Sequence, residues 1–101
     1  MDILLSDLRQ ITESLFAHLE ETGIETIRLQ NDYYWHISGE ELFDPYKVPS
    51  ELNLGQLSDD WRDLQNVADG KSDPLLSDFN DLAAVLRAIG ELGEDFLFTR
   101  E

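Results

Sequence analysis

Cysteine is absent from this chain of 101 residues, and positive charge is scarce in it. Without cysteine the protein has no disulfide scaffold, no thiolate zinc site and no cysteine nucleophile, which fits a reducing compartment. The first five residues, Met1-Asp2-Ile3-Leu4-Leu5, place an acid where a secretory signal carries positive charge. No apolar run approaches the ~20 residues that span a membrane. We therefore expect a cytoplasmic protein.

The charge balance is strongly acidic, with seven Lys and Arg against 22 Asp and Glu and a formal net charge of −15. Such a field repels phosphate backbones and anionic lipid headgroups, so we expect neither nucleic acid nor membrane as a partner. It attracts a basic protein instead. The same charge also promotes solubility, as in many small acidic bacterial proteins, and both interpretations stay open.

Hydrophobic residues make up 42% of the chain, which predicts one folded domain over residues 1–101. Residues 1–23 are predicted to form a long amphipathic helix, because apolar residues recur along one helical stripe. The stripe comprises Leu4, Leu8, Ile11, Leu15 and Leu19, widened by Leu5 and Phe16. Gly23 suits the left-handed conformation that ends many helices, so we place the helix end there.

Residues 24–38 alternate between apolar and polar side chains, which is typical of a β-hairpin, and Asn31-Asp32 supplies turn chemistry. An odd-length loop or a bulge is preferred, because it gathers one apolar face from both strands: Ile27, Leu29, Trp35 and Ile37. Tyr34 and His36 then lie on the opposite face. The alternation over residues 51–54 leaves a short third strand open.

Two further helices are predicted in the second half of the chain. Ser58 is a suitable N-cap for the first of them, which Gly70 ends. The other begins at Asp73-Pro74 or at Ser77-Asp78 and is frayed or ended by Gly90 and Gly93. Its broad apolar face comprises Phe79, Leu82, Val85, Leu86 and Ile89. Residues 95–98 are expected to pack back as an extended segment.

This order of elements predicts an α+β fold with a long N-terminal helix, an antiparallel β-hairpin and two C-terminal helices packed on one face of the sheet. We expect Trp35 and Trp61 in the core, because a chain this small needs large apolar side chains there.

No motif in the sequence carries a recognised chemistry. The two histidines, His18 and His36, lack metal-binding spacing, and the six glycines are too scattered for a phosphate-binding loop. No serine lies in a Gly-x-Ser-x-Gly pattern. The acids Asp59, Asp60 and Asp63 suit a solvated helix start better than a cation site. We therefore expect no enzyme activity, no metal and no cofactor.

The segment from residue 39 to residue 49 is predicted to be a connector, because Pro45 and Pro49 break regular structure. Aromatic anchors inside a charged rim are typical of protein interfaces. The connector and its flanks combine both, so we predict an interaction surface composed of Tyr34, His36, Glu40, Glu41, Phe43, Asp44, Tyr46, Asp59 and Asp60.

The favoured hypothesis is a non-enzymatic protein-interaction module, of inhibitor, immunity or adaptor type, that binds a basic partner. One alternative is a small ligand-binding or enzymatic domain with a site around Tyr34, His36 and residues 39–46. A second is a homo-oligomeric structural protein, a homodimer through the third helix, where Ala83, Ala84 and Ala88 permit close approach.

Overall fold

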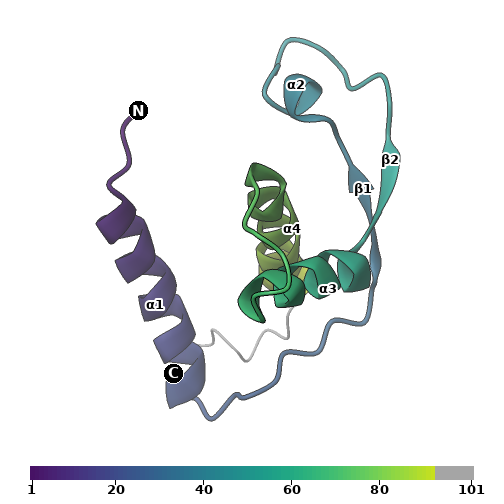
Figure 1. Cartoon of the computed structure of the whole chain (residues 1–101). Helices are drawn as coiled ribbons and strands as arrows, with labels where there is room; N and C mark the ends of the chain where they lie inside the picture. The colour runs from purple at the N-terminus through teal and green to yellow at the C-terminus, as the bar shows by residue number, and fades with distance from the viewer. Residues whose placement is uncertain (93–101) are drawn as a thin grey trace. The chain divides into compact units, whose positions relative to one another are not determined.

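The computed structural model describes residues 1–92, and these fall into two compact units, residues 1–28 and residues 29–92 (Figure 1). The first unit contains helix α1 (Leu5–Glu21). The second contains the strands and the other helices: β1 (Tyr33–His36), α2 (Gly39–Leu42), β2 (Asn53–Gln56), α3 (Leu57–Ala68) and α4 (Leu76–Leu92). The predicted α+β class, with its antiparallel strand pair and two C-terminal helices, is confirmed. The predicted packing of residues 95–98 lies outside the described residues.

Helix α1 ends as its sequence predicts. Gly23 has a φ of 84°, and its N–H donates to the Glu20 carbonyl at 2.9 Å while the Ile24 N–H donates to the Leu19 carbonyl at 3.1 Å. These two bonds form a Schellman motif, which satisfies carbonyls that the last helical turn leaves unpaired. Of the predicted apolar stripe, Leu19 is buried, whereas Leu4, Leu8, Ile11 and Leu15 are exposed.

The predicted pairing of the β-hairpin is wrong. Residues 24–29 form no strand, and β1 pairs instead with β2, antiparallel, with Tyr34 opposite Gly55 and Trp35 opposite Leu54. The segment considered as a third strand is therefore the second strand, shifted to residues 53–56. Residues 37–52 join the two strands, and this longer segment, which includes the predicted residues 39–49, is called the connector from here on. It was expected to lack regular structure, but its first residues form the single turn α2, because both helix-breaking prolines lie after that turn.

The orientation of β1 is also the reverse of the prediction. Trp35 was expected in the core but is 67% exposed, whereas Tyr34 is half-buried against the core of its unit. Gly55 explains this reversal, because a Cβ atom there would overlap the Cζ, Cε1 and Cε2 atoms of the Tyr34 ring. The glycine opens space on one face of the strand pair, and the aromatic ring fills it.

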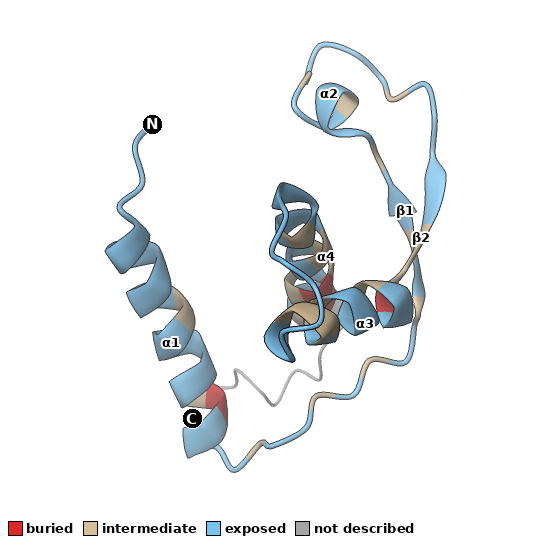
Figure 2. Cartoon of the chain, viewed as in Figure 1, coloured by how far each residue is buried: buried red, intermediate tan, exposed pale blue. Residues whose placement is uncertain are grey.

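The core of the second unit is small and lies between α3 and α4. Leu57, Val85 and Ala88 are its buried residues (Figure 2). Partly buried side chains complete the cluster: Leu29, Tyr34, Leu64, Ala84 and Ile89. Trp61, expected in this core, is 51% exposed, and α3 contributes Leu57 and Leu64 to the cluster instead.

Some of the helix ends in the second unit are where capping residues in the sequence predict them, and others are not. Gly70, with a φ of 75°, ends α3 in a second Schellman motif, as predicted. Helix α4 begins at Leu76, where Asp78 accepts a hydrogen bond from the Leu75 N–H at 2.7 Å, and it continues through Gly90. The predicted cap of α3 is wrong: Ser58 is the second helical residue and makes no cap bond within its own helix.

Candidate functional site

The connector is a closed loop whose backbone is held by short-range hydrogen bonds. Helix α2 forms a single turn, and its Glu41 carboxylate accepts hydrogen bonds from the backbone N–H and the hydroxyl of Ser50, the latter at 2.8 Å. These bonds fasten the start of the connector to its end. They also lower the pKa of Glu41, because both Ser50 donors favour the ionised carboxylate.

Asp44 holds the next turn of the connector. Its Oδ1 accepts a hydrogen bond from the Tyr46 N–H at 3.2 Å, and its backbone carbonyl accepts one from the Lys47 N–H at 3.3 Å. The Lys47 ammonium lies 3.9 Å from the other carboxylate oxygen of Asp44. An aspartate side chain bonded two residues ahead forms an Asx turn, so residues 44–47 have a defined conformation.

Large apolar side chains stand in solvent on this defined backbone. Phe43 is 84% exposed and Tyr46 is 96% exposed. Further exposed apolar residues of the connector are Leu42, Val48 and Leu52. Neighbouring Trp35 and Leu54, which face each other across the strand pair, are exposed as well. The small core of the second unit does not cover these side chains. Among the loops of this unit, the connector therefore exposes the most apolar residues.

Most of the acids predicted for the interaction surface have carboxylates that already form hydrogen bonds or ion pairs within the protein. Glu40 is exposed on α2, whereas Glu41 and Asp44 hold the connector. Asp59 forms an ion pair with Arg62 one turn along α3. Asp60 accepts a hydrogen bond from the Tyr34 hydroxyl at 2.6 Å. The structure thus assigns Tyr34 and Asp60 to the contact between β1 and α3.

The Tyr34–Asp60 contact belongs to a cluster of acids between α3 and α4. Burial, the hydrogen bond to Asp60 and the negative charges of Asp60 and Asp81 raise the pKa of Tyr34 well above its usual value. The pKa of Asp81 is raised too, first by burial and then by the charges of Asp60, Asp63 and Asp78. Both shifts show that the ionised forms are disfavoured, because each would add negative charge beside other acids in a partly buried site.

Replacing Asp81 with asparagine is expected to stabilise the protein by on the order of 0.5 kcal/mol at pH 7, since solvent screens most of the repulsion it removes. A carboxyl whose pKa is raised by folding costs stability once it ionises. The gain is therefore full at neutral pH and disappears as the pH falls through the raised pKa to the ordinary value of about 4. Denaturant unfolding of both proteins from pH 7 to pH 3.5 measures this difference. A gain that is independent of pH, or an equal gain in Asp73→Asn, would contradict it.

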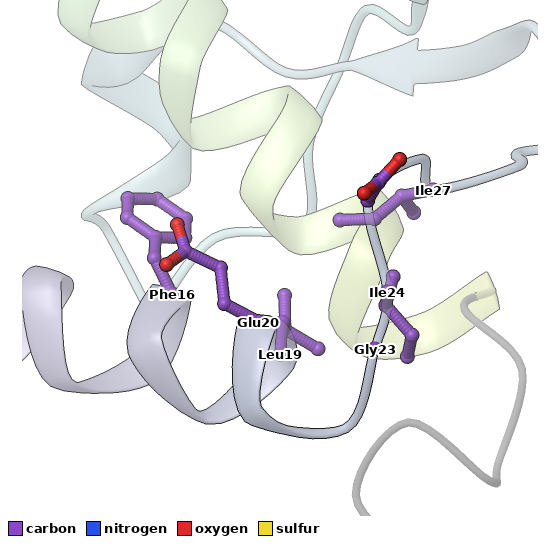
Figure 3. Close-up of a pocket in the computed structure, with 7 residues that line it drawn as sticks. Phe16, Leu19, Glu20, Gly23, Ile24 and Ile27 are labelled. Atoms are coloured by element: carbon purple, nitrogen blue, oxygen red, sulfur yellow. The ribbon is translucent and has the colours of Figure 1, made fainter.

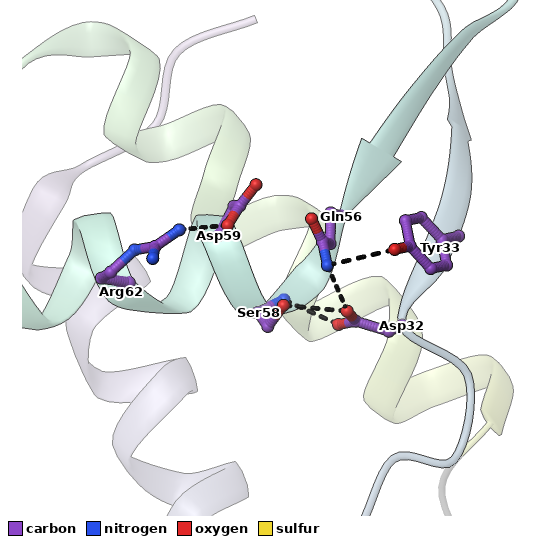
Figure 4. Close-up of polar contacts among 6 residues, drawn as sticks. All are labelled: Asp32, Tyr33, Gln56, Ser58, Asp59 and Arg62. Carbon is purple, nitrogen blue, oxygen red and sulfur yellow. Dashed lines mark hydrogen bonds and ion pairs between the residues drawn. The ribbon is translucent and has the colours of Figure 1, made fainter.

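Asp32 joins the strand pair to the start of α3 (Figure 4). Its carboxylate accepts hydrogen bonds at 2.8 Å from the Ser58 N–H, the Ser58 hydroxyl and the Gln56 side-chain amide, and its carbonyl accepts one from the Leu57 N–H at 2.7 Å. An acid 26 residues away in sequence from Ser58 thus provides the N-terminal cap of α3. The side-chain bonds from Gln56 and Ser58 lower the pKa of Asp32.

Asp32→Ala is expected to lower the melting temperature by several degrees at pH 7, because α3 loses its capping carboxylate. Folding lowers the pKa of this carboxyl, so the carboxyl stabilises the protein at any pH above its pKa in the unfolded chain. That stabilisation is lost as the pH falls through its lower pKa in the folded protein. The difference from wild type should therefore shrink below about pH 4. Thermal unfolding followed by circular dichroism tests this, with Asp73→Ala as the matched loss of an exposed acid. Equal effects of the two substitutions would refute the capping role.

The other predicted site residue, His36, is exposed at the end of β1 opposite Asn53. A pocket lies elsewhere, in the first unit, at the C-terminal end of α1. In the described residues 1–92, no group of three or more histidines and acids is arranged to hold a metal ion. No described helix is both long and apolar enough to cross a membrane.

Sequence reasoning missed several residues that build this region. Ser50 and Asp32 act through hydrogen bonds to residues distant in sequence, which no local pattern reveals. Gly55 did carry a signal, because a glycine inside an alternating segment indicates close approach of another group. Leu42 and Val48 were absent from the predicted surface although both are exposed on the connector.

No family model, no curated protein and no solved structure matches this chain.

Proposed function

We propose that the protein is a non-enzymatic interaction module that binds a basic partner protein through the connector. The observation that carries this proposal is the exposure of Phe43 and Tyr46 on a backbone that Glu41 and Asp44 hold in place. A loop whose backbone is already ordered loses little backbone conformational freedom when a partner covers it. Aromatic residues in that position are the most common energetic anchors of protein interfaces.

The charge of the connector supports a basic partner. Residues 37–52 contain four acids, Glu40, Glu41, Asp44 and Glu51, and a single cation, Lys47, which is paired with Asp44. The chain as a whole carries a net charge of −15, so its long-range field steers cations toward it. An aromatic centre surrounded by acids matches a partner surface with an apolar recess and a basic rim, such as the substrate-binding face of an enzyme that acts on polyanions.

The test is capture of partners from cells of the native host on the immobilised protein at low salt, followed by affinity measurements with each captured protein. Glu40→Lys reverses the charge of an acid that the fold does not use, and Asp73→Lys makes the same change outside the connector. We expect binding that weakens with salt and is reduced by Glu40→Lys more than by Asp73→Lys. Equal effects of both substitutions, or capture that does not depend on salt, would refute the proposal.

A further inference from the structure

The connector is long for a segment that joins two paired strands. The strand pair ends at His36 and Asn53, and residues 37–52 close the loop between them (Figure 1). Most hairpin loops contain only about two to five residues, and longer loops have many conformations unless internal contacts restrict them. The conformation of this loop therefore depends on the bonds that form within it.

Glu41 and Ser50 form the contact that divides this loop, and we call their hydrogen-bonded pair the clasp. The two carboxylate oxygens of Glu41 accept separate bonds, Oε2 from the Ser50 backbone N–H and Oε1 from the Ser50 hydroxyl at 2.8 Å. Bonds to an ionised acceptor are stronger than bonds between neutral groups. The clasp lies in the second unit and shares no residue with the pocket of the first unit (Figure 3). It closes residues 42–49 into a smaller loop inside the connector.

The most exposed apolar side chains of the connector all lie inside this smaller loop. They are Leu42, Phe43, Tyr46 and Val48, whereas Leu52, outside the loop, is less exposed than any of them. Within the described second unit no residue buries these four side chains, so hydrophobic burial does not favour one conformation of the loop over another. The hydrogen bonds within the connector must therefore hold it.

We propose that the clasp makes the connector a two-state element, with a closed state that fixes residues 42–49 and an open state in which they lose that conformation. Glu41 and Ser50 are then positioning residues, which hold Phe43 and Tyr46 in place without contacting a partner. The two states are a property of the free protein, whereas the consequence for binding rests on the function proposed above. A partner that binds only the closed state has an affinity that falls with the closed fraction.

Trypsin cleavage after Lys47 measures opening in the free, full-length protein. A protease binds its substrate as an extended segment, whereas Asp44 and Lys47 form a turn in the closed loop. Cleavage therefore follows the open fraction when opening and closing are faster than cleavage. Lys71, between α3 and α4, is the internal reference, because it lies outside the connector and reports loss of the whole fold. Mass spectrometry separates the two cuts.

Glu41→Ala removes both acceptors of the clasp, and we expect it to shift the equilibrium about tenfold toward the open state. Cleavage after Lys47 should become at least about threefold faster, with cleavage after Lys71 unchanged. Glu40→Ala is the matched control, since it removes an exposed acid from the same turn that takes no part in the clasp. It should leave both cuts unchanged.

Ser50 supplies the conservative variants. Ser50→Ala removes the hydroxyl donor but keeps the backbone N–H, so it should accelerate cleavage after Lys47 less than Glu41→Ala does. Ser50→Thr keeps the hydroxyl and should restore the wild-type rate. In a Glu41→Ala background Ser50→Ala should add nothing, because its acceptor is already gone. An equal acceleration in both backgrounds would show that Ser50 acts independently of Glu41.

The captured basic partner tests the positioning role through its association and dissociation rates. Glu41→Ala should lower the association rate about two- to threefold and leave the dissociation rate unchanged, because only the closed fraction binds. High salt screens the long-range effect of the lost charge, so the rates are compared there. Phe43→Ala/Tyr46→Ala should raise the dissociation rate instead, since it removes direct contacts.

The two sets of results separate this proposal from the proposed function. Equal cleavage after Lys47 in Glu41→Ala and Glu40→Ala, or an equal rise after Lys71, would overturn the two-state connector whatever the partner does. Faster cleavage with an unchanged association rate would overturn the positioning role and leave the binding surface in place. If Glu40→Lys and Asp73→Lys affect the partner equally, the proposed function fails, and the cleavage rates still decide whether the clasp holds the loop.

Discussion

Gly55→Ala is expected to destabilise the protein by about 1–3 kcal/mol, the typical cost of forcing an extra methyl group into occupied space. The new Cβ atom would overlap the ring of Tyr34, which lies across Gly55 and donates its hydroxyl hydrogen bond to Asp60. The ring must move, and its movement breaks the contact between β1 and α3. The raised pKa of Tyr34 should then fall toward the ordinary value of about 10, since burial and Asp60 both cause the shift.

Chemical denaturation measures the stability change, and ring-carbon NMR as a function of pH measures the pKa. Gly39→Ala is the matched control, because a Cβ atom there meets nothing within 4 Å. In a Tyr34→Ala background Gly55→Ala should be close to neutral, which gives a strong coupling in the double-mutant cycle. Equal losses in both backgrounds would show that the Tyr34 ring is not the cause.

Replacing Phe43 and Tyr46 together with alanine is expected to weaken binding of the captured basic partner at least ~100-fold. Each side chain is an exposed aromatic on an ordered backbone, and truncating such an anchor typically costs about 2 kcal/mol or more of binding energy. Folding stability should change by less than about 0.5 kcal/mol, because neither side chain is buried.

Affinity measurements with the purified partner test this prediction, alongside unfolding curves that show each variant is folded. Leu75→Ala/Leu76→Ala is the matched control, since it removes two exposed apolar side chains outside the connector. An equal loss of affinity in that control would mean that general apolar exposure, rather than the connector, drives binding.

Local signals in the sequence were sufficient to predict α1, α3 and α4, but not the start of α3 at Leu57 or the single turn α2. Gly23 and Gly70 end α1 and α3 because glycine adopts positive φ without steric cost, and that preference is visible in the sequence. The spacing of Leu4, Leu8, Ile11 and Leu15 predicted one face of α1 correctly. It did not predict burial, because periodicity marks an apolar face without showing what covers it.

Strand pairing could not be predicted from alternation alone. Residues 24–29 and 51–54 both alternate, and the segment nearer to β1 was preferred over the one that overlaps its true partner, β2. The choice depends on contacts between distant residues: Tyr34 with Gly55, Tyr34 with Asp60, and Asp32 with Ser58. The error reversed the faces of β1, so Trp35 was assigned to the core in place of Tyr34.

The predicted interaction surface combined aromatic and acidic residues, but sequence alone could not separate their structural roles. Phe43, Tyr46 and Glu40 stand exposed on the connector, whereas Glu41, Asp44 and Asp60 hold parts of the second unit together. That separation changes how the surface is tested. Reversing the charge of the structural acids would disturb the fold, so Glu40 is the informative position.

The most direct test of the connector as the binding surface is hydrogen–deuterium exchange of the full chain with and without its captured basic partner. The account predicts slower exchange on binding in residues 37–52, with the same segment unaffected in Phe43→Ala/Tyr46→Ala at equal partner concentration. Protection confined to other segments, with exchange in residues 37–52 unchanged, would contradict it.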